Sequence, residues 1–275
     1  MRGIAVITGT THGIGRVTSR ELAKAGYRVV MLCRNDGAAS AVRAEILTQV
    51  PGAAVHTVRC DLSSLASVRE CAAILRRDCD RIDLLINNAG MVSTRRQSSA
   101  DGYELTFATN HLGPFLLTQQ LLDRISEQGR IVNLASRAHY KGRLDLQQVA
   151  QRRARYDARL VYATSKLANV MHTFALARRL TGTQISANCL HPGVVATHLL
   201  PRWLRLIKPL LSPGIIDAER GARTTLYLAL SGEVAGVSGR YFDEHQQVQP
   251  AAAAANDVEL QEALWRASEG WVAAR

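Results

Sequence analysis

The stretch Thr8-Gly9-Thr10-Thr11-His12-Gly13-Ile14-Gly15 decides how this chain is expected to fold. An apolar run, Ile4–Thr8, leads into it and is typical of a buried strand, while the pattern over Gly15–Ala25 is typical of a helix. Glycines at such a turn let the backbone approach a pyrophosphate, and the N–H groups of the following helix then face the anion. A glycine-rich turn alone is a weak signal, because many plain strand–helix turns contain glycine. The residues expected to contact a dinucleotide here are Gly9, Thr11, His12, Gly13, Ile14 and Gly15.

The rest of the chain repeats this alternation of strand and helix. Further strands are predicted at Arg28–Leu32, Val55–Arg59, Leu84–Asn87, Arg130–Leu134, Gln184–Leu190 and Gly239–Phe242. Further helices are predicted at Ala38–Gln49, Leu65–Asp78, Glu104–Arg124, Leu160–Leu180 and Ala218–Leu230. Apolar strands separated by helices are typical of a parallel sheet covered on both faces. We therefore expect an α/β fold: a single doubly wound Rossmann-type domain over residues 1–275, with about seven parallel strands.

Composition excludes several other classes of protein. Hydrophobic residues make up 47% and charged residues 21%, as in an ordinary globular domain, and no apolar run is long enough to span a bilayer. The first strand starts too early for a preceding signal peptide or anchor, which favours a cytoplasmic protein. The cysteine count is odd and without a C-x-x-C pair, so we expect packed thiols and no metal site. The cysteines are Cys33, Cys60, Cys71, Cys79 and Cys189.

The net charge is +11, and almost all of it comes from arginine. The basic residues are scattered along the chain, which argues against a nucleic-acid partner and for the amino-acid usage of a GC-rich, bacterial genome. A positive surface also suits a phosphorylated cofactor.

The residues at the end of the second strand indicate which cofactor the chain binds. Enzymes that use NAD commonly place an acid there to hold the ribose hydroxyl, whereas this chain has Cys33-Arg34-Asn35, and Asp36 comes two residues too late. A guanidinium pairs well with a phosphate. Arg34 therefore predicts NADP(H), and His12 either reaches the same phosphate or is simply an exposed turn residue.

Residues Tyr162-Ala-Thr-Ser-Lys166 place a phenol and an ammonium one helical turn apart, on one face of a helix. An isolated pair at this spacing is usually just a solvated helix with a half-buried tyrosine. Here the glycine turn and Ser136, just past the fifth strand, favour a catalytic pair. The two motifs together indicate an oxidoreductase.

These motifs resemble those of the short-chain dehydrogenases/reductases with the T-G-x-x-x-G-x-G spacing. The matching residues are Thr8–Gly15, Cys60-Asp61-Leu62, Asn87-Asn88-Ala89-Gly90, Asn110, Ser136, Tyr162, Lys166 and Pro192-Gly193. Within that family the chain is most similar to the retinol-dehydrogenase-like branch. The segments that resemble it are Cys33-Arg34, 61–69, 110–118, 165–169 and His191-Pro192-Gly193. The membrane-bound members of that branch have an N-terminal anchor, and the early first strand at Ile4–Thr8 predicts no such anchor here.

The resemblance implies a role for each catalytic residue. Tyr162 would be the general acid for carbonyl reduction, or the base for alcohol oxidation. The pKa of a free phenol is about 10, and Lys166 and the positive nicotinamide ring would lower it. Ser136 would bond the substrate oxygen. Asn110 would anchor a water that links Lys166 to solvent, although a locally bonded helix-interior asparagine is the plainer interpretation.

The resemblance also implies the remaining cofactor contacts. Asp61 with Leu62 would meet the adenine, and Tyr162 and Lys166 the nicotinamide ribose. Asn88, Ala89 and Gly90 would line the adenosine ribose side, although Asn-Ala-Gly also suits a simple turn. The nicotinamide carboxamide and phosphate would be held by Pro192, Gly193, Val195 and Thr197.

Two segments outside the regular pattern concern the substrate. Residues 197–217 are apolar with interspersed basic residues, and we interpret them as a lid over a lipophilic substrate; packing on the sheet edge or weak membrane-surface contact are the alternatives. The insert Arg143–Arg159 contains Arg152-Arg153-Ala154-Arg155, which is either a solvated face or a docking site for an acidic carrier protein or a coenzyme-A-like substrate. The insert leaves the choice between monomer and dimer open.

The C-terminal residues 257–273 predict a helix that packs on the domain or closes over the pocket edge, with Ala251–Ala255 as a low-complexity connector before it. The sequence as a whole predicts an NADPH-dependent reductase of a lipophilic ketone or aldehyde, reversible as an alcohol dehydrogenase and acting in secondary metabolism. An enone reductase on the same fold and a catalytically silent NADP-binding regulator are the alternatives.

Overall fold

The computed structural model describes residues 2–147, 156–195 and 215–273 and contains a seven-stranded parallel sheet with the order β3-β2-β1-β4-β5-β6-β9. The strands are β1 (Ile4–Thr8), β2 (Arg28–Cys33), β3 (Val55–Arg59), β4 (Ile82–Asn87), β5 (Ile125–Leu134), β6 (Ser186–Leu190) and β9 (Tyr241–Phe242). The order of the strands reverses between β1 and β4, and open α/β sheets bind their ligands at the carboxyl ends of the strands at such a point. The predicted single α/β domain is confirmed.

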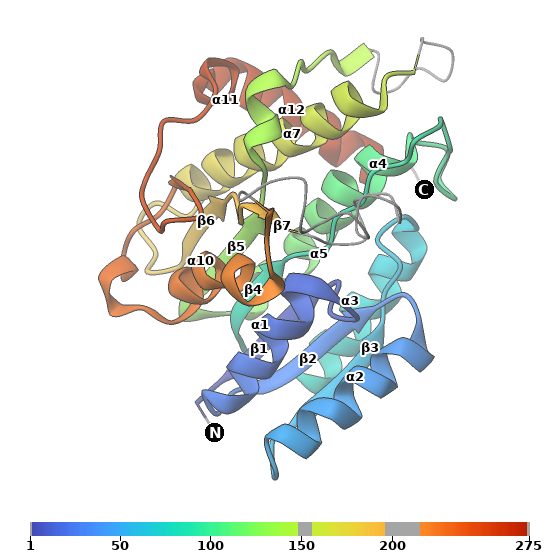
Figure 1. Ribbon diagram of the computed structural model, residues 1–275. Helices are drawn as coiled ribbons and strands as arrows, with labels where there is room; N and C mark the ends of the chain where they lie inside the picture. The colour runs from blue at the N-terminus through green and yellow to red at the C-terminus, as the bar shows by residue number, and fades with distance from the viewer. Residues whose placement is uncertain (1, 148–155, 196–214, 274–275) are drawn as a thin grey trace.

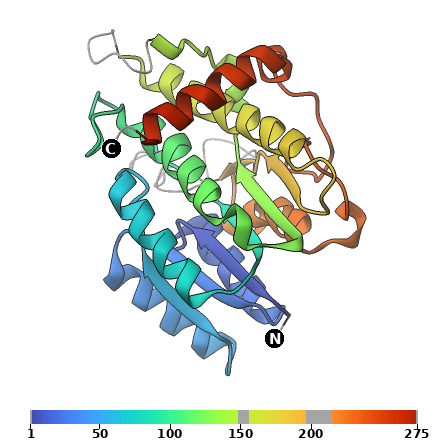
Figure 2. The same ribbon diagram turned by 180° about the vertical axis from the view of Figure 1, so that it is seen from behind.

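Helices cover both faces of the sheet. One face carries α1 (Gly13–Lys24), α2 (Asp36–Gln49) and α10 (Ala218–Leu230), which lie in front of the sheet in Figure 1. The view from behind in Figure 2 shows the other face, with α3 (Leu65–Asp78), α5 (Gly113–Leu121), α7 (Ala158–Arg179) and α12 (Val258–Ala273).

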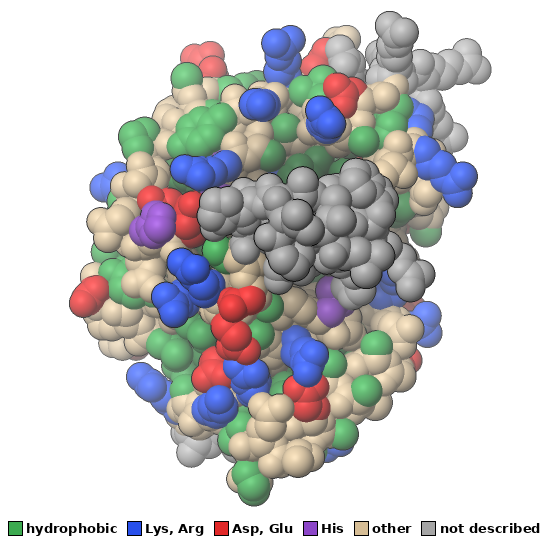
Figure 3. Space-filling model, viewed as in Figure 1, with side chains coloured by type: hydrophobic (Ala, Val, Ile, Leu, Met, Phe, Trp, Pro, Cys, Tyr) green, Lys and Arg blue, Asp and Glu red, His purple; other side chains and the backbone are tan. Residues whose placement is uncertain are grey.

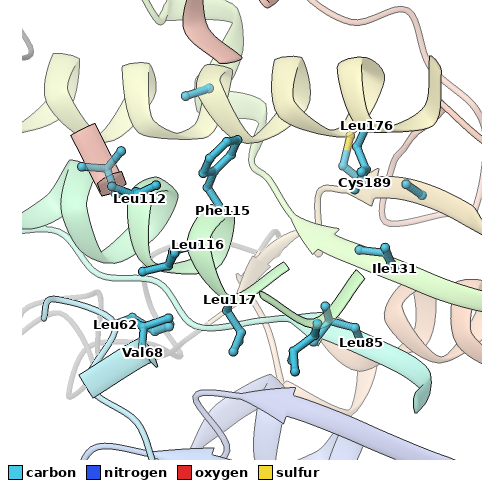
Figure 4. Packing of buried hydrophobic residues seen from close by; sticks show 14 of the residues in the cluster. Leu62, Val68, Leu85, Leu112, Phe115, Leu116, Leu117, Ile131, Leu176 and Cys189 are labelled. Atoms are coloured by element: carbon cyan, nitrogen blue, oxygen red, sulfur yellow. The ribbon is translucent and has the colours of Figure 1, made fainter. Parts of the chain in front are cut away.

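The two faces form two separate hydrophobic cores. Successive residues of a strand point to opposite faces, so Ile7 of β1 packs with the helices α1 and α2 while Val6 packs with α3 and α5. Figure 4 shows the second core, where Phe115 of α5 points toward α7 and Leu176 of α7 meets Cys189 of β6. All five cysteines are buried free thiols.

The predicted helix Glu104–Arg124 is not one helix. It consists of α4 (Leu105–Phe107), a π-helical turn over Ala108–Leu112, α5, and a 3-10 turn over Leu122–Arg124. Pro114 explains the wide turn, because it lacks the N–H that an α-helix would donate to the carbonyl of Asn110. Turns of this kind are frequent at functional sites.

The C-terminal region corrects one expectation. The predicted connector Ala251–Ala255 is not featureless, since a short helix, α11, runs over Ala253–Asn256 and Ala255 is fully buried. Small side chains let the backbone pack closely on the core beside α7. Next to it, α12 buries Leu264 and Trp265 against α7 and α5.

The segments expected to concern the substrate are described only at their ends. A small parallel pairing joins β7 (Val194–Val195) to β8 (Ile215–Ile216), and the predicted lid 197–217 lies outside the described residues except for its last three. The arginine run of the insert also lies outside them.

On the face seen in Figure 3, basic and acidic side chains are interspersed without a basic stripe. Among the described residues, no helix combines the length and apolarity needed to cross a membrane.

Candidate active site

The residues singled out in the sequence collect at one edge of the sheet, because parallel strands all end there. Gly9 follows β1, Arg34 follows β2, Asp61 follows β3 and Ser136 follows β5. The segment Asn88-Ala89-Gly90 comes directly after β4, at the point where the strand order reverses. Open α/β sheets bind ligands at this edge, at the point where the strand order reverses.

The glycine turn has no room for larger residues. Gly9 has a φ of +71°, and a Cβ on Gly15 would lie 2.3 Å from the carbonyl oxygen of Gly9. The side chain of Asn88 clamps the turn from the β4 side, donating to the carbonyls of Thr8 at 2.8 Å and Gly9 at 3.1 Å. The amide of Ala89 donates to the Thr8 hydroxyl at 2.9 Å. The turn is therefore held in the shape that lets a backbone approach a phosphate group.

The N-terminus of α1 is open to an anion. His12 is its N-cap residue and makes no capping bond with its side chain, and the first turn contains no acid. The N–H groups at the start of a helix favour negative charge. Gly9, Gly13 and Gly15 thus form a cradle that fits a pyrophosphate.

Arg34 is exposed and lies between two neighbours whose side chains are fixed. Cys33 is buried and its Sγ lies 2.8 Å from the hydroxyl of Thr10, while Asn35 caps α2 by accepting from the N–H of Ala38. Both neighbours fix the backbone at the end of β2 beside the glycine turn. Among the described residues no ion pair holds the guanidinium of Arg34, and its expected contact with a phosphate stays a prediction.

At the end of β3, Asp61 and Leu62 differ in their surroundings. One oxygen of Asp61 accepts from the backbone N–H and the hydroxyl of Ser63, at 3.0 and 2.6 Å. Leu62 is buried and packs against α5, where a Cβ on Gly113 would lie 2.3 Å from the Leu62 carbonyl oxygen. The adenine contact expected of both residues stays a prediction.

Lys166 is buried, and its ammonium is fixed. Its Nζ donates to the carbonyl of Leu134 at 2.8 Å and lies 5.8 Å from the centre of the Tyr162 ring. Gly90 leaves space for it, because a Cβ there would lie 3.2 Å from Nζ. Burial lowers the pKa of Lys166 to about 8, because a buried ammonium loses its hydration.

Tyr162 and Ser136 meet across the end of β5. Burial raises the pKa of the Tyr162 phenol, and its hydrogen bond with Ser136 lowers the pKa by a smaller amount. Ser136 also accepts from the N–H of Ala138 at 3.2 Å, which orients its hydroxyl. The chain's own residues therefore keep the phenol protonated at neutral pH and place a second hydroxyl beside it.

The chain is similar in sequence to known proteins. A family model described as short chain dehydrogenase matches residues 3–205. The chain belongs to the short-chain dehydrogenase family. It is 38% identical to human retinol dehydrogenase 13 over 96% of this chain and 82% of that protein, and 37% identical to mouse retinol dehydrogenase 12 over 96% and 84%.

The fold of the chain is also similar to solved structures. An uncharacterised protein from Mycobacterium paratuberculosis is 34% identical, with a TM-score of 0.81 over 99% of this chain and 94% of that chain. A blue fluorescent protein from a metagenomic library, in complex with NADPH, is 26% identical, with a TM-score of 0.71 over 88% and 96%. The chain is thus an oxidoreductase-family member with a retinol-dehydrogenase-like sequence.

In this short-chain dehydrogenase, Asn110 is fully buried and bridges two segments. It accepts from the N–H of Met91 at 2.8 Å and donates to the carbonyl of Met91 at 2.9 Å and to the hydroxyl of Ser165 at 3.0 Å. The asparagine is therefore not bonded only within its own helix. It joins the loop after β4 to the helix that carries Tyr162, and the water it is expected to anchor stays a prediction.

The structure describes only part of the segment expected to hold the nicotinamide, which runs from Pro192 to Thr197. Gly193 has a φ of +86°, and a Cβ there would lie 2.6 Å from Cδ1 of Ile216, so the turn after β6 needs glycine. Pro192 precedes it and is half-buried. Thr197 and the side chain of Val195 lie outside the described residues.

Sequence reasoning missed the residues that support the catalytic group. Asn169, one turn after Lys166, donates to the same Leu134 carbonyl at 3.3 Å, and Ser165 donates to the carbonyl of Tyr162 at 2.7 Å. The helical spacing of Asn169 and Lys166 was the available signal. Among the described residues, no group of three or more His, Cys, Asp or Glu side chains could hold a metal ion.

Proposed function

We propose that this short-chain dehydrogenase uses NADPH to reduce the ketone or aldehyde group of a lipophilic small molecule, and runs in reverse as an alcohol dehydrogenase. The pairing of the protonated Tyr162 phenol with Ser136, beside the fixed ammonium of Lys166, carries this proposal. The apolar sequence of residues 197–217 supports a lipophilic substrate.

The residues present suggest which step of the reaction each side chain would perform. The hydroxyls of Tyr162 and Ser136 would donate hydrogen bonds to the substrate carbonyl, polarising it and fixing its orientation. When bound, the reduced cofactor supplies the hydride. Tyr162 would then give its proton to the oxygen, and the positive charge of Lys166 would stabilise the phenolate left behind.

The preference for NADP(H) over NAD(H) rests on Arg34. Its exposed guanidinium stands where an acid would hold the ribose hydroxyl of NAD, and Asp36 already belongs to α2. The NADPH found in the blue fluorescent protein is consistent with this preference.

Turnover by the wild type tests the proposal. NADPH oxidation is followed against a panel of lipophilic aldehydes, ketones and enones, with Tyr162→Phe as the matched control. Oxidation by the wild type that is lost in the variant is the expected result. Tight NADPH binding without turnover of any panel member would contradict the reductase and favour an NADP-binding regulator.

A further inference from the structure

A second polar cluster lies at the same edge of the sheet, apart from the four catalytic residues. It consists of Arg137, directly after Ser136; His191, directly after β6; and Glu244, two residues after β9. Strand pairing brings them together, since Leu190 of β6 pairs with Phe242 of β9 and β5 pairs with β6. The cluster therefore borders the Pro192-Gly193 turn.

His191 is buried with an exposed fraction of 5%, and its backbone N–H donates to the carbonyl of Phe242 at 2.8 Å. Within the described part of the chain, neither ring nitrogen of His191 has a hydrogen-bond partner. Burial lowers the pKa of His191 to about 4, and the charge of Glu244 opposes part of that effect. The ring is thus neutral at pH 7, with one donor and one acceptor nitrogen unused.

Glu244 presents a second unused group. Its Oε1 lies 3.5 Å from a guanidinium nitrogen of Arg137, whereas its Oε2 is buried and has no partner among the described residues. The Cβ of Glu244 would lie 3.5 Å from a Cβ on Gly193, so the side chain packs directly against the turn expected to hold the nicotinamide.

Unpaired buried polar groups are costly and rare, and each calls for an explanation such as a ligand. A carboxylate oxygen only accepts, so a group that satisfies Glu244 has to donate. The N–H of the neutral imidazole needs an acceptor as well. An anion would be repelled by Glu244. An ammonium would be repelled by Arg137, which lies 3.5 Å from Glu244, and it has no acceptor atom for the imidazole N–H. A neutral hydroxyl can donate to Glu244 and accept from the imidazole N–H, so that one group pairs with both residues and leaves only the acceptor nitrogen of His191.

We propose that His191 and Glu244 form a subsite that binds a neutral hydroxyl group of the substrate, beside the carbonyl that reacts. The inference rests on the proposed reductase function and deepens it, because it defines the substrate as a hydroxylated lipophilic carbonyl compound. Arg137 holds Glu244 at the subsite through their ion pair and neutralises part of its charge.

Matched probes test the subsite. The kcat/KM of NADPH-dependent reduction is measured for α-tetralone, its ring-hydroxylated isomers and their methyl ethers. We expect at least one hydroxylated isomer to exceed the parent ketone by about tenfold or more, and its methyl ether to lose that advantage because it cannot donate. In Glu244→Gln and His191→Leu the ratio of hydroxylated to parent kcat/KM falls at least about fivefold. His245→Gln, an exposed neighbour, serves as the control and keeps the wild-type ratio.

Thermal melting distinguishes a ligand-binding histidine from a structural one. Replacing an unpaired buried polar group with an apolar one of similar size is neutral or stabilising, so His191→Leu is expected to melt no lower than the wild type. A much lower melting temperature together with an unchanged substrate ratio would overturn the subsite. Equal kcat/KM values for all wild-type probes would also overturn it, while leaving the reductase intact. Absence of any NADPH oxidation with these probes and with the wider panel would overturn both.

Discussion

Two regions at the carboxyl ends of the strands are built in opposite ways. The proposed catalytic half contains Asn110, Ser136, Tyr162 and Lys166, and the proposed cofactor half contains the glycine turn and Arg34. In the catalytic half, Asn110 and Lys166 are buried and use their side-chain donors on backbone carbonyls and a neighbouring serine. In the cofactor half, α1 begins without a side-chain cap and Arg34 is exposed. Other helices of the same sheet are capped, for example α3 by Ser64 and α7 by Asp157.

The difference teaches which groups are preorganised and which await a ligand. Proton transfer needs fixed geometry, so bonds within the protein hold the catalytic side chains before a substrate binds. Anion binding needs N–H groups and a cation that can pair with the anion. In the proposed cofactor half, the uncapped N-terminus of α1 and the exposed Arg34 can supply them. Substitutions in the first half should therefore reduce the rate of chemistry, and substitutions in the second should reduce cofactor affinity.

The largest effect is expected from Tyr162→Phe. Removing the hydroxyl removes the proton donor, and general acid catalysis contributes roughly 10²- to 10⁴-fold. We expect kcat to fall by that factor while the dissociation constant of NADPH changes little. Steady-state rates and fluorescence titration of NADPH measure the two quantities. A normal kcat in this variant would remove Tyr162 from the mechanism.

Gly15→Ala should act on the other half. The added Cβ would lie 2.3 Å from the carbonyl oxygen of Gly9 and 2.5 Å from the amide nitrogen of Asn88, so the turn has to shift. Overpacking of this kind costs about 3 kcal/mol, which corresponds to a roughly hundredfold weaker affinity for both NADPH and NADH. Gly270→Ala is the control, because nothing lies within 4 Å of a Cβ there. Unchanged affinity in the Gly15 variant would contradict the cradle.

Arg34→Ala sharpens the comparison, because it should separate the two cofactors. Hydrogen bonds to charged groups contribute about 2 kcal/mol, so NADPH should bind roughly thirtyfold more weakly while the affinity for NADH stays the same. Arg266→Ala, at an exposed position of α12, controls for the loss of one positive charge. Equal weakening of both cofactors would show that Arg34 does not read the 2′-phosphate.

The smallest effect is expected on the pH dependence of stability, from two buried histidines that pack behind the proposed catalytic half. His172 and His111 are buried between α5, α7 and α12, and burial lowers their pKa values to about 3 and about 4, from about 6.5 in an unfolded chain. The unfolded chain binds more protons below pH 6.5, so stability falls as the pH drops through that value. Each histidine should reduce the free energy of unfolding by about 1 kcal/mol between pH 7 and pH 5.5.

His172→Phe should remove the contribution of one such histidine. Urea unfolding at the two pH values measures it, with His245→Gln as an exposed control that leaves the pH dependence unchanged. An unaltered pH dependence in His172→Phe would show that this ring is not the buried neutral group that the structure indicates.

Local patterns predicted much of the fold and the placement of Tyr162 and Lys166 on one helix. The strand Ile4–Thr8 and the spacing of Tyr162 and Lys166 depend on residues close in sequence, and the structure places both as expected. Periodicity could not show the π-helical turn around Asn110, because apolar residues continue across it. A proline inside an apolar run was the only local sign of the break.

Contacts between distant segments were beyond the sequence patterns. His191 and Glu244 are far apart in the chain, and they come to the same end of the sheet because β9 pairs with β6. The burial of Ala255 likewise depends on helices elsewhere in the chain, so an alanine run looked like a connector. Tertiary packing determines both features, and neither leaves a periodic signal.

The transfer of deuterium from NADPH tests the central claim most directly. The enzyme is given NADPH deuterated at the transferred position of the nicotinamide ring and an enone substrate that offers both a C=O and a C=C bond, and NMR locates the label in the product. The account predicts deuterium on the carbinol carbon, and labelled product from Tyr162→Phe at a rate lower by about 10²- to 10⁴-fold. Deuterium on the carbon β to the carbonyl would establish enone reduction instead and contradict the proposed carbonyl reductase.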